Sequence, residues 1–334
     1  MNTVYYRLPL NDVYTRISYD GEPLLLTSYA DLGQREGFVI APFVISDETP
    51  LILLPSDTPG WQRSEYRLSS ATRDWKVVDE QEYRNVYEAD FGIFHNQVNN
   101  GRFDKLVLSR CRRVTLDREP DLEQIFIYYC NAYPNAMVML FSTPLSGTWL
   151  VASPEILLES DPSGALHTIA LAGTMPYSEG TLQWSDKNRH EQHIVEQYIG
   201  NTIAPLCHAV TKTGPLTSRA GSLAHLRTDF TFTLDSQSSF GQVLSLLHPT
   251  PAVCGMPKER ALPFVLANES GNRRYYTGFA GPIGMDCGTH LYVSLRCMSI
   301  DGNHCTVYAG GGIMPDSNAD DEWNETRLKM IIAK

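Results

Sequence analysis

Short apolar runs separated by polar and turn-forming residues cover the first part of the chain. The runs at 38–43 (FVIAPF) and 51–54 (LILL) are bounded by Pro, Gly and Asp, which is typical of short strands and turns. Longer runs follow: KLVLSRCRRVTL at 105–116, two runs around a Pro-Leu-Ser-Gly turn within 136–153, and two more around an Asp-Gly-Asn turn within 291–311. The paired runs predict antiparallel hairpins.

Two segments have the 3.6-residue period of an amphipathic helix. The clearer one extends from about Ser185 to Cys207, with Ser185 or Asp186 suited to the N-cap, and one of its faces carries Glu191, Ile194, Val195, Tyr198, Ile199 and Ile203. The other begins near Asp320, and its face carries Glu322, Glu325, Leu328 and Ile332. Because no linker-like Gly/Ser tract and no repeat divides the chain, we expect one α+β domain over 1–334, with hairpin sheets and helices packed outside.

Composition narrows the class of protein. Of 334 residues, 43% are hydrophobic and 19% charged, which is ordinary for a folded globular protein. The net charge of -11 and the lack of a basic run argue against nucleic acid or anionic lipid as a partner. The seven cysteines form no C-x-x-C pair, so we expect free thiols. No signal peptide or membrane-spanning run is visible, which favours a cytoplasmic protein.

Acidic residues stand where the helical period predicts apolar contacts. Glu191 leads one face, and Glu322 and Glu325 lead the other. Each acid could simply lie near solvent at a helix start, where the helix dipole favours it by about 0.3–1 kcal/mol. Alternatively, the two faces oppose each other and supply oxygens to Mg²⁺, with Asn188 as an outer group.

Three further features could have either an ordinary structural role or a role in chemistry. Lys105 could be a solvated surface charge or a base. Glu155 follows Ser153-Pro154, so it could mark a helix start or be an acid. The glycines at 310–312 could expose backbone N–H groups to an anion or form a tight turn.

Taken together, the chain resembles the chorismate-utilising enzymes, which include isochorismate, salicylate, anthranilate and aminodeoxychorismate synthases. The resemblance covers about 100–334, and 1–90 match weakly. It rests on nine ordered segments: FDKLVLSR (103–110), ASPEILLE (152–159), LAGT (171–174), DKNRHEQHIVE (186–196), LHPTPAVCG (247–255), YYTGFAGPIG (275–284), SLRC (294–297), YAGGGIMP (308–315) and EWNETRLK (322–329).

The resemblance implies paired antiparallel sheets surrounded by helices, with the active site in a cleft between them. It implies Mg²⁺ as cofactor, with Glu191 and Glu325 as direct ligands and Glu322 behind them. Asn188 departs from the acidic residue common in relatives. The implied substrate contacts are Gly173, Thr174, Ala252, Tyr276, Arg296, the backbone of Gly310, and Lys329; the implied acid is Glu155.

Lys105 distinguishes between branches of the family, because relatives that add ammonia carry Gln there and those that add water carry Lys. Ala172 replaces the nucleophilic Lys of the aminodeoxychorismate branch. At Ala252, relatives that also eliminate pyruvate tend to carry Thr. The resemblance therefore implies an isochorismate synthase, with Lys105 as base and Glu155 as acid.

Two alternatives stay open: a salicylate synthase and a non-catalytic protein that binds chorismate or metal. As partners we expect chorismate, no obligatory protein and no second copy. The product could serve menaquinone or siderophore synthesis.

Overall fold

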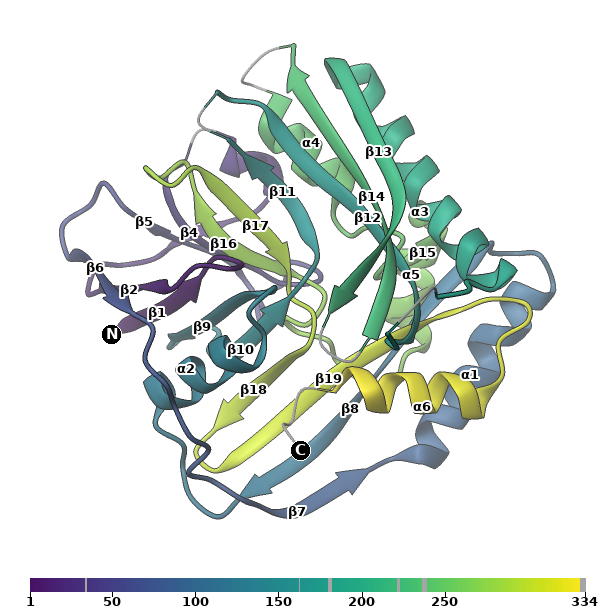
Figure 1. The fold of residues 1–334 in the computed structure, drawn as a ribbon, viewed down its shortest axis with the longest axis horizontal. Coiled ribbons are helices and arrows are strands. Elements are labelled where there is room, and N and C mark those ends of the chain that lie inside the picture. Colours follow the sequence, from purple (N-terminus) through teal and green to yellow (C-terminus); the bar gives the residue numbers. More distant parts are fainter. Residues whose placement is uncertain (34, 162, 180–181, 221–222, 236–238, 331–334) are drawn as a thin grey trace.

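The computed structural model describes residues 1–330 except 34, 162, 180–181, 221–222 and 236–238. Two antiparallel sheets form its frame (Figure 1). In order of pairing, the strands of the first sheet are β15 (Gly255–Met256), β8 (Lys105–Leu116), β19 (His304–Ile313), β18 (Cys297–Asp301), β10 (Gly147–Ser153), β9 (Met137–Thr143), β1 (Asn2–Arg7), β2 (Val13–Tyr19) and β6 (Trp61–Arg67), with β7 (Val77–Glu82) also paired to β8. Those of the second sheet are β13 (Cys207–Ala220), β14 (Leu223–Leu234), β12 (Leu166–Pro176), β11 (Ile156–Ser160), β17 (Thr289–Val293), β16 (Phe279–Ile283), β4 (Gly37–Ala41), β5 (Leu51–Pro55) and β3 (Leu24–Leu26).

Helices pack outside the sheets. They are α1 (Arg84–Asn99), α2 (Leu122–Ala132), α3 (Asp186–Ile203), α4 (Ser239–Leu247), α5 (Lys258–Asn268) and α6 (Ala319–Lys329), with the short 3₁₀ helices η1 (Tyr29–Leu32) and η2 (Ala204–Leu206). The apolar core between the sheets includes Ile17, Phe38, Phe141 and Trp149. Separate apolar clusters hold α3 and α4 against the second sheet, and α1, α2 and α5 against the first. The predicted α+β architecture is confirmed.

The predicted strands at 38–43, 51–54 and 105–116 and the hairpin within 136–153 are confirmed. The prediction for 291–300 is wrong in one respect, because this apolar run is not one strand. Thr289–Val293 lies in the second sheet and Cys297–Asp301 in the first, so the chain crosses between sheets at 294–296. Arg296 has a positive φ of 46° at this crossing, which breaks the extended backbone.

The helices at 186–203 and 319–329 also bear out the prediction, and Ser185 is the N-cap of α3, accepting a hydrogen bond from the backbone N of Asn188. The predicted apolar face of α6 is wrong at Leu328, which is 48% exposed. Trp323 and Thr326 are buried instead, together with Glu322. Ile332 lies outside the described residues.

None of the described helices has the length and hydropathy needed to cross a membrane. All seven cysteines are free, as predicted.

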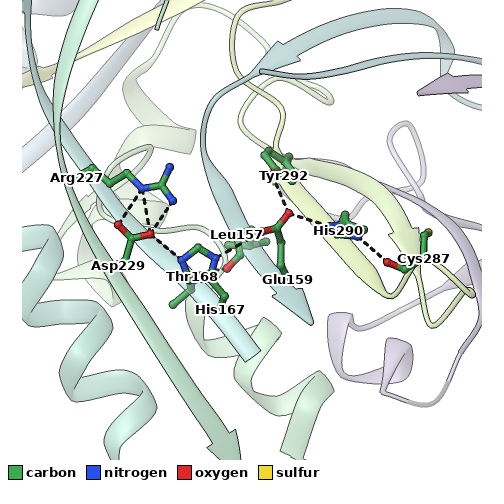
Figure 2. Close-up of polar contacts among 9 residues, drawn as sticks. All are labelled: Leu157, Glu159, His167, Thr168, Arg227, Asp229, Cys287, His290 and Tyr292. Carbon is green, nitrogen blue, oxygen red and sulfur yellow. Dashed lines mark hydrogen bonds and ion pairs between the residues drawn. The ribbon is translucent and has the colours of Figure 1, made fainter. Parts of the chain in front are cut away.

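A chain of charged side chains crosses four neighbouring strands of the second sheet (Figure 2). Arg227 of β14 binds Asp229 with two nitrogens, and Asp229 accepts from Nε2 of His167 on β12 at 2.8 Å. On β11, Glu159 lies 3.5 Å from Nδ1 of His167 and accepts from Nδ1 of His290 at 2.9 Å. We call these five residues the polar ladder.

Both histidines of the polar ladder are held in the charged form. Nε2 of His290 faces the carbonyl oxygen of Cys287 at 2.8 Å, and since a carbonyl only accepts, this nitrogen carries a proton. Burial lowers the pKa of each histidine, but the neighbouring carboxylates have the larger effect and raise both pKa values. Glu159 acts on both histidines, and Asp229 also acts on His167. Burial alone would raise the pKa of Glu159, but hydrogen bonds from His167, His290 and Tyr292 lower it to about 2.

Glu159→Gln should therefore lower the free energy of unfolding by about 1–3 kcal/mol, because it removes the acceptor of charge-assisted hydrogen bonds. The stabilisation from the histidines is full below pH ~6.5 and is lost as pH rises through their raised pKa values; that from Glu159 is full above pH ~4.5 and is lost as pH falls through about 2. Urea unfolding should show the largest difference from the parent chain between pH ~4.5 and ~6.5. Glu88→Gln, in an exposed ion pair with Arg84, is the control; equal losses for both variants would contradict the role of the polar ladder.

Candidate active site

A cavity opens between strands of the two sheets. Its walls come from β8, β12, β19, α3, α6 and the crossings between sheets. Nine of the residues predicted from the sequence line it: Glu155, Gly173, Thr174, Glu191, Ala252, Tyr276, Arg296, Gly310 and Lys329. The remaining three are close to lining residues: Lys105 pairs with Glu191, Glu325 pairs with Lys329, and Glu322 lies beside Gly311. The fold thus gathers segments separated by more than 200 residues.

Lys105 begins β8 and is 1% exposed. Its Nζ donates to Oε1 of Glu191 on α3 at 2.8 Å. Burial opposes ionisation of Glu191, but the charge and hydrogen bond of Lys105 prevail and lower its pKa. A side chain at position 312 would collide with both residues, so Gly312 leaves the space in which this ion pair forms.

Glu155 lies at the crossing from β10 to β11, where the chain passes from the first sheet to the second. It is 3% exposed, and no helix starts at Ser153-Pro154, so the interpretation of Glu155 as a helix-start residue is wrong. Burial raises the pKa of Glu155 to about 8, against the opposing charges of Lys105 and Lys329. A carboxyl with this pKa is mostly protonated at neutral pH and can donate a proton.

The three acids proposed from helical spacing meet around the glycines of β19. A Cβ at Gly311 would lie 2.9 Å from Oε2 of Glu322 and 3.7 Å from Oε1 of Glu325. Glu322 is 2% exposed, so the alternative of a solvated helix start is wrong for it. Burial and the neighbouring charge of Glu325 raise the pKa of Glu322, and Lys187 opposes them.

These carboxylates fit a hard divalent cation in donor type. The lack of side chains at Gly311 and Gly312 lets these carboxylates approach β19 closely, and Mg²⁺ commonly uses one or two carboxylates plus water and substrate oxygens. Each acid instead has a lysine partner at 2.6–2.8 Å: Lys105 for Glu191, Lys187 for Glu322 and Lys329 for Glu325. Among the described residues, no three His, Cys, Asp or Glu side chains form a ready-made metal cage.

Arg296 also brings positive charge to the cavity. Its NH1 donates to the carbonyl oxygen of Ala220 at 2.8 Å and its NH2 to Nε2 of His225 at 2.9 Å. Burial lowers the pKa of Arg296 to about 10, which leaves it charged at neutral pH. Burial together with Arg296 and Lys329 lowers the pKa of His225 well below its ordinary value, so this ring is neutral and accepts from Arg296.

Polar contacts fix several of the other predicted residues. Lys329 donates to the carbonyl oxygen of Gly310 at 3.2 Å, so this carbonyl is already engaged. The glycines at 310–312 lie within β19, which excludes the tight-turn interpretation. Asn188 donates to the carbonyl oxygen of Thr174 at 3.4 Å and does not pair with the acids.

Sequence reasoning missed several residues of this site. His225 and Lys187 both contact predicted site residues, yet neither stands out of pattern in its segment. Ser317, which donates to Oε1 of Glu322 at 2.6 Å, was also missed. Only the observation that a buried acid needs partners could have prompted a search for them.

The sequence profile of a family described as "Chorismate binding enzyme" matches residues 61–332. The chain is 30% identical over 243 residues to the isochorismate synthase EntC of Escherichia coli, covering 68% of this chain and 60% of that protein. It is 29% identical over 246 residues to the isochorismate synthase MenF of Bacillus subtilis, covering 70% and 52%. The match thus spans little more than half the length of these curated relatives.

Among solved structures, the menaquinone-specific isochorismate synthase MenF of Escherichia coli superposes with a TM-score of 0.81 at 22% identity. The superposition covers 98% of this chain and 87% of that one, so it includes the N-terminal strands. Such low identity speaks for the fold alone. With the profile match over 61–332, the chain belongs to the chorismate-binding enzyme family.

Proposed function

We propose that this chain is a magnesium-dependent isochorismate synthase that adds water to C2 of chorismate while the C4 hydroxyl leaves. The observation that carries the proposal is a cavity lined by a buried carboxyl, Glu155, whose pKa is raised to about 8, and by Glu191, to which the buried Lys105 donates. The names of the curated relatives also support it.

In this mechanism Lys105 is the general base and Glu155 the general acid. Lys105 takes a proton from the attacking water as the new C2–O bond forms. The ring double bonds shift, and Glu155 gives its proton to the C4 hydroxyl, which leaves as water. Positioned acid–base groups of this kind contribute about 10²–10⁴-fold each.

Charge on the substrate has specific partners in the cavity. Arg296 and Lys329 would bind the two carboxylates of chorismate, which a chain of net charge -11 would otherwise repel. Tyr276 and Ala252, which also line the cavity, would pack against the substrate. His225 would hold Arg296 in place through its neutral ring.

Glu191 and Glu325 would hold Mg²⁺, and Glu322 would support them from behind. When bound, the ion supplies electrostatic stabilisation of the charge that develops through the ring and its carboxylate. For Lys105 to act as a base, its ion pair with Glu191 has to be relaxed. Engagement of the Glu191 carboxylate elsewhere would serve that purpose.

Incubation of the purified protein with chorismate and Mg²⁺, followed by chromatography, tests the activity. Isochorismate alone is the expected product. Salicylate plus pyruvate would instead indicate a salicylate synthase, and unchanged chorismate would indicate a binding protein.

Excess chelator should abolish turnover, and added Mg²⁺ should restore it. Glu325→Gln should raise the Mg²⁺ concentration for half-maximal rate at least about 10-fold, because even outer partners of a metal site are worth 10–100-fold in affinity. Glu48→Gln, on an exposed loop, is the control and should not change it. Full activity in excess chelator contradicts the magnesium requirement.

A further inference from the structure

A buried ion pair between Arg273 and Glu269 lies outside the catalytic residues already named. Nε of Arg273 donates to Oε2 of Glu269 at 2.6 Å and NH2 to Oε1 at 2.8 Å. The side chains are 3% and 4% exposed, and neither residue lines the cavity. Burying two charges is costly unless their geometry is good and their remaining donors are satisfied. The partners of the remaining donors therefore indicate what the pair is for.

Those partners lie on the two segments that carry the site. NH2 of Arg273 also donates to the carbonyl oxygen of Val107 on β8 at 2.8 Å, and NH1 to that of Val253 at 2.6 Å. Oε1 of Glu269 accepts from the backbone N of Ser109 at 2.6 Å. Val107 and Val253 both line the cavity.

Each anchored segment holds a residue of the proposed mechanism. Val107 is two residues from Lys105 on β8, and Val253 follows Ala252 directly. A third connection runs through the backbone, because the N of Tyr276 donates to the carbonyl oxygen of Arg273 at 2.8 Å. The guanidinium carbon also lies 4.4 Å from the centre of the Phe43 ring, a cation–π contact.

We propose that Arg273 and Glu269 are a positioning pair, which sets the distance between Lys105 on β8 and the substrate wall at Ala252. This inference rests on the proposed function for its catalytic consequence. A displacement of about 1 Å at reacting groups can cost about 10²-fold in rate. A planar fork with fixed donors can join the two carbonyls and the carboxylate at once, whereas the compact ammonium of a lysine cannot.

Arg273→Lys tests the proposal, because it keeps the charge and removes the fork. We expect kcat for chorismate to fall about 10- to 100-fold, with a much smaller change in KM, since Arg296 and Lys329 are untouched. Glu269→Gln, which retains an acceptor for the N of Ser109, is the second variant if Arg273→Lys fails to fold, and kcat should fall there too.

Variants of Ile125, a buried residue of α2 in a different apolar cluster, provide the matched control. The unfolding temperatures of Ile125→Val and Ile125→Ala should lie on either side of that of Arg273→Lys. The kcat of each variant is measured well below its unfolding temperature. A purely structural role predicts the same kcat in variants of equal midpoint. Unchanged kcat in Arg273→Lys, or an equal loss in the Ile125 variants, overturns the positioning role.

A readout independent of turnover separates this inference from the proposed function. The backbone N of Val107 donates to the carbonyl oxygen of Cys254 at 2.9 Å, next to both anchored carbonyls. Hydrogen exchange of this amide should be faster in Arg273→Lys than in the Ile125 control. If the parent chain leaves chorismate unchanged, the proposed function fails, and unaltered exchange at Val107 would then overturn the positioning pair as well.

Discussion

Lys105→Gln should lower kcat for hydration of chorismate by about 10²–10⁴-fold, with little change in KM. Glutamine can still donate a hydrogen bond to Glu191, but it cannot take a proton from water. The parent residue is 1% exposed, so bulk water offers no easy substitute for it. Initial rates of isochorismate formation at saturating chorismate and Mg²⁺ measure the effect.

Lys105→Arg is the informative companion. Arginine keeps the positive charge beside Glu191, yet it stays protonated in proteins and so cannot act as a base. Both variants should therefore be impaired alike. Recovery of the rate in Lys105→Arg would show that the charge matters and the base does not.

Glu155→Gln should reduce kcat by a similar 10²–10⁴-fold, because the amide has the shape of the carboxylic acid but no acidic proton that it can transfer. In the parent chain, the pKa of Glu155 is raised to about 8. As the proposed acid, Glu155 would act in its protonated form, so kcat should fall as pH rises through about 8. A rate profile with no such limb, or a variant within tenfold of the parent, contradicts the assignment.

The same variant has a signature in stability. Between the ordinary pKa of a glutamate and about 8, the folded parent chain binds a proton that the unfolded chain has released, so its stability declines as pH rises over this range. Glutamine has no such linkage. Denaturant unfolding should therefore show that stability falls less in Glu155→Gln than in the parent chain as pH rises from ~4.5 to about 8.

Much of the fold could be predicted from local sequence, since hairpins and helices follow from periodicity and turn residues. The crossing at 294–296 could not, because LYVSLRCMSI contains no Gly, Pro, Asn or Asp to mark a turn. The strand pairing shows that two sheets share this run, and the left-handed backbone at Arg296 marks the break.

The acids of the site were visible as residues out of pattern, but their partners were not. Glu191 and Lys105 are far apart in sequence and meet only through pairing of strands and packing of α3. Leu328 shows the converse. The helical period predicts that it lies on the buried face of α6 with the acids, but its side chain is exposed, and Trp323 packs in the apolar cluster instead. Contacts of this kind depend on topology, which spacing along one chain does not encode.

The chain passes from one sheet to the other at Glu155 and again near Arg296. Both residues therefore lie in connections between the sheets, and the distance between them depends on how the two sheets pack against each other. Sliding of the sheets would move the acid and the arginine at once. The tightly packed core at Phe141 and Trp149 takes no part in the proposed chemistry. Because it resists sliding of the sheets, it keeps the distance between Glu155 and Arg296 constant.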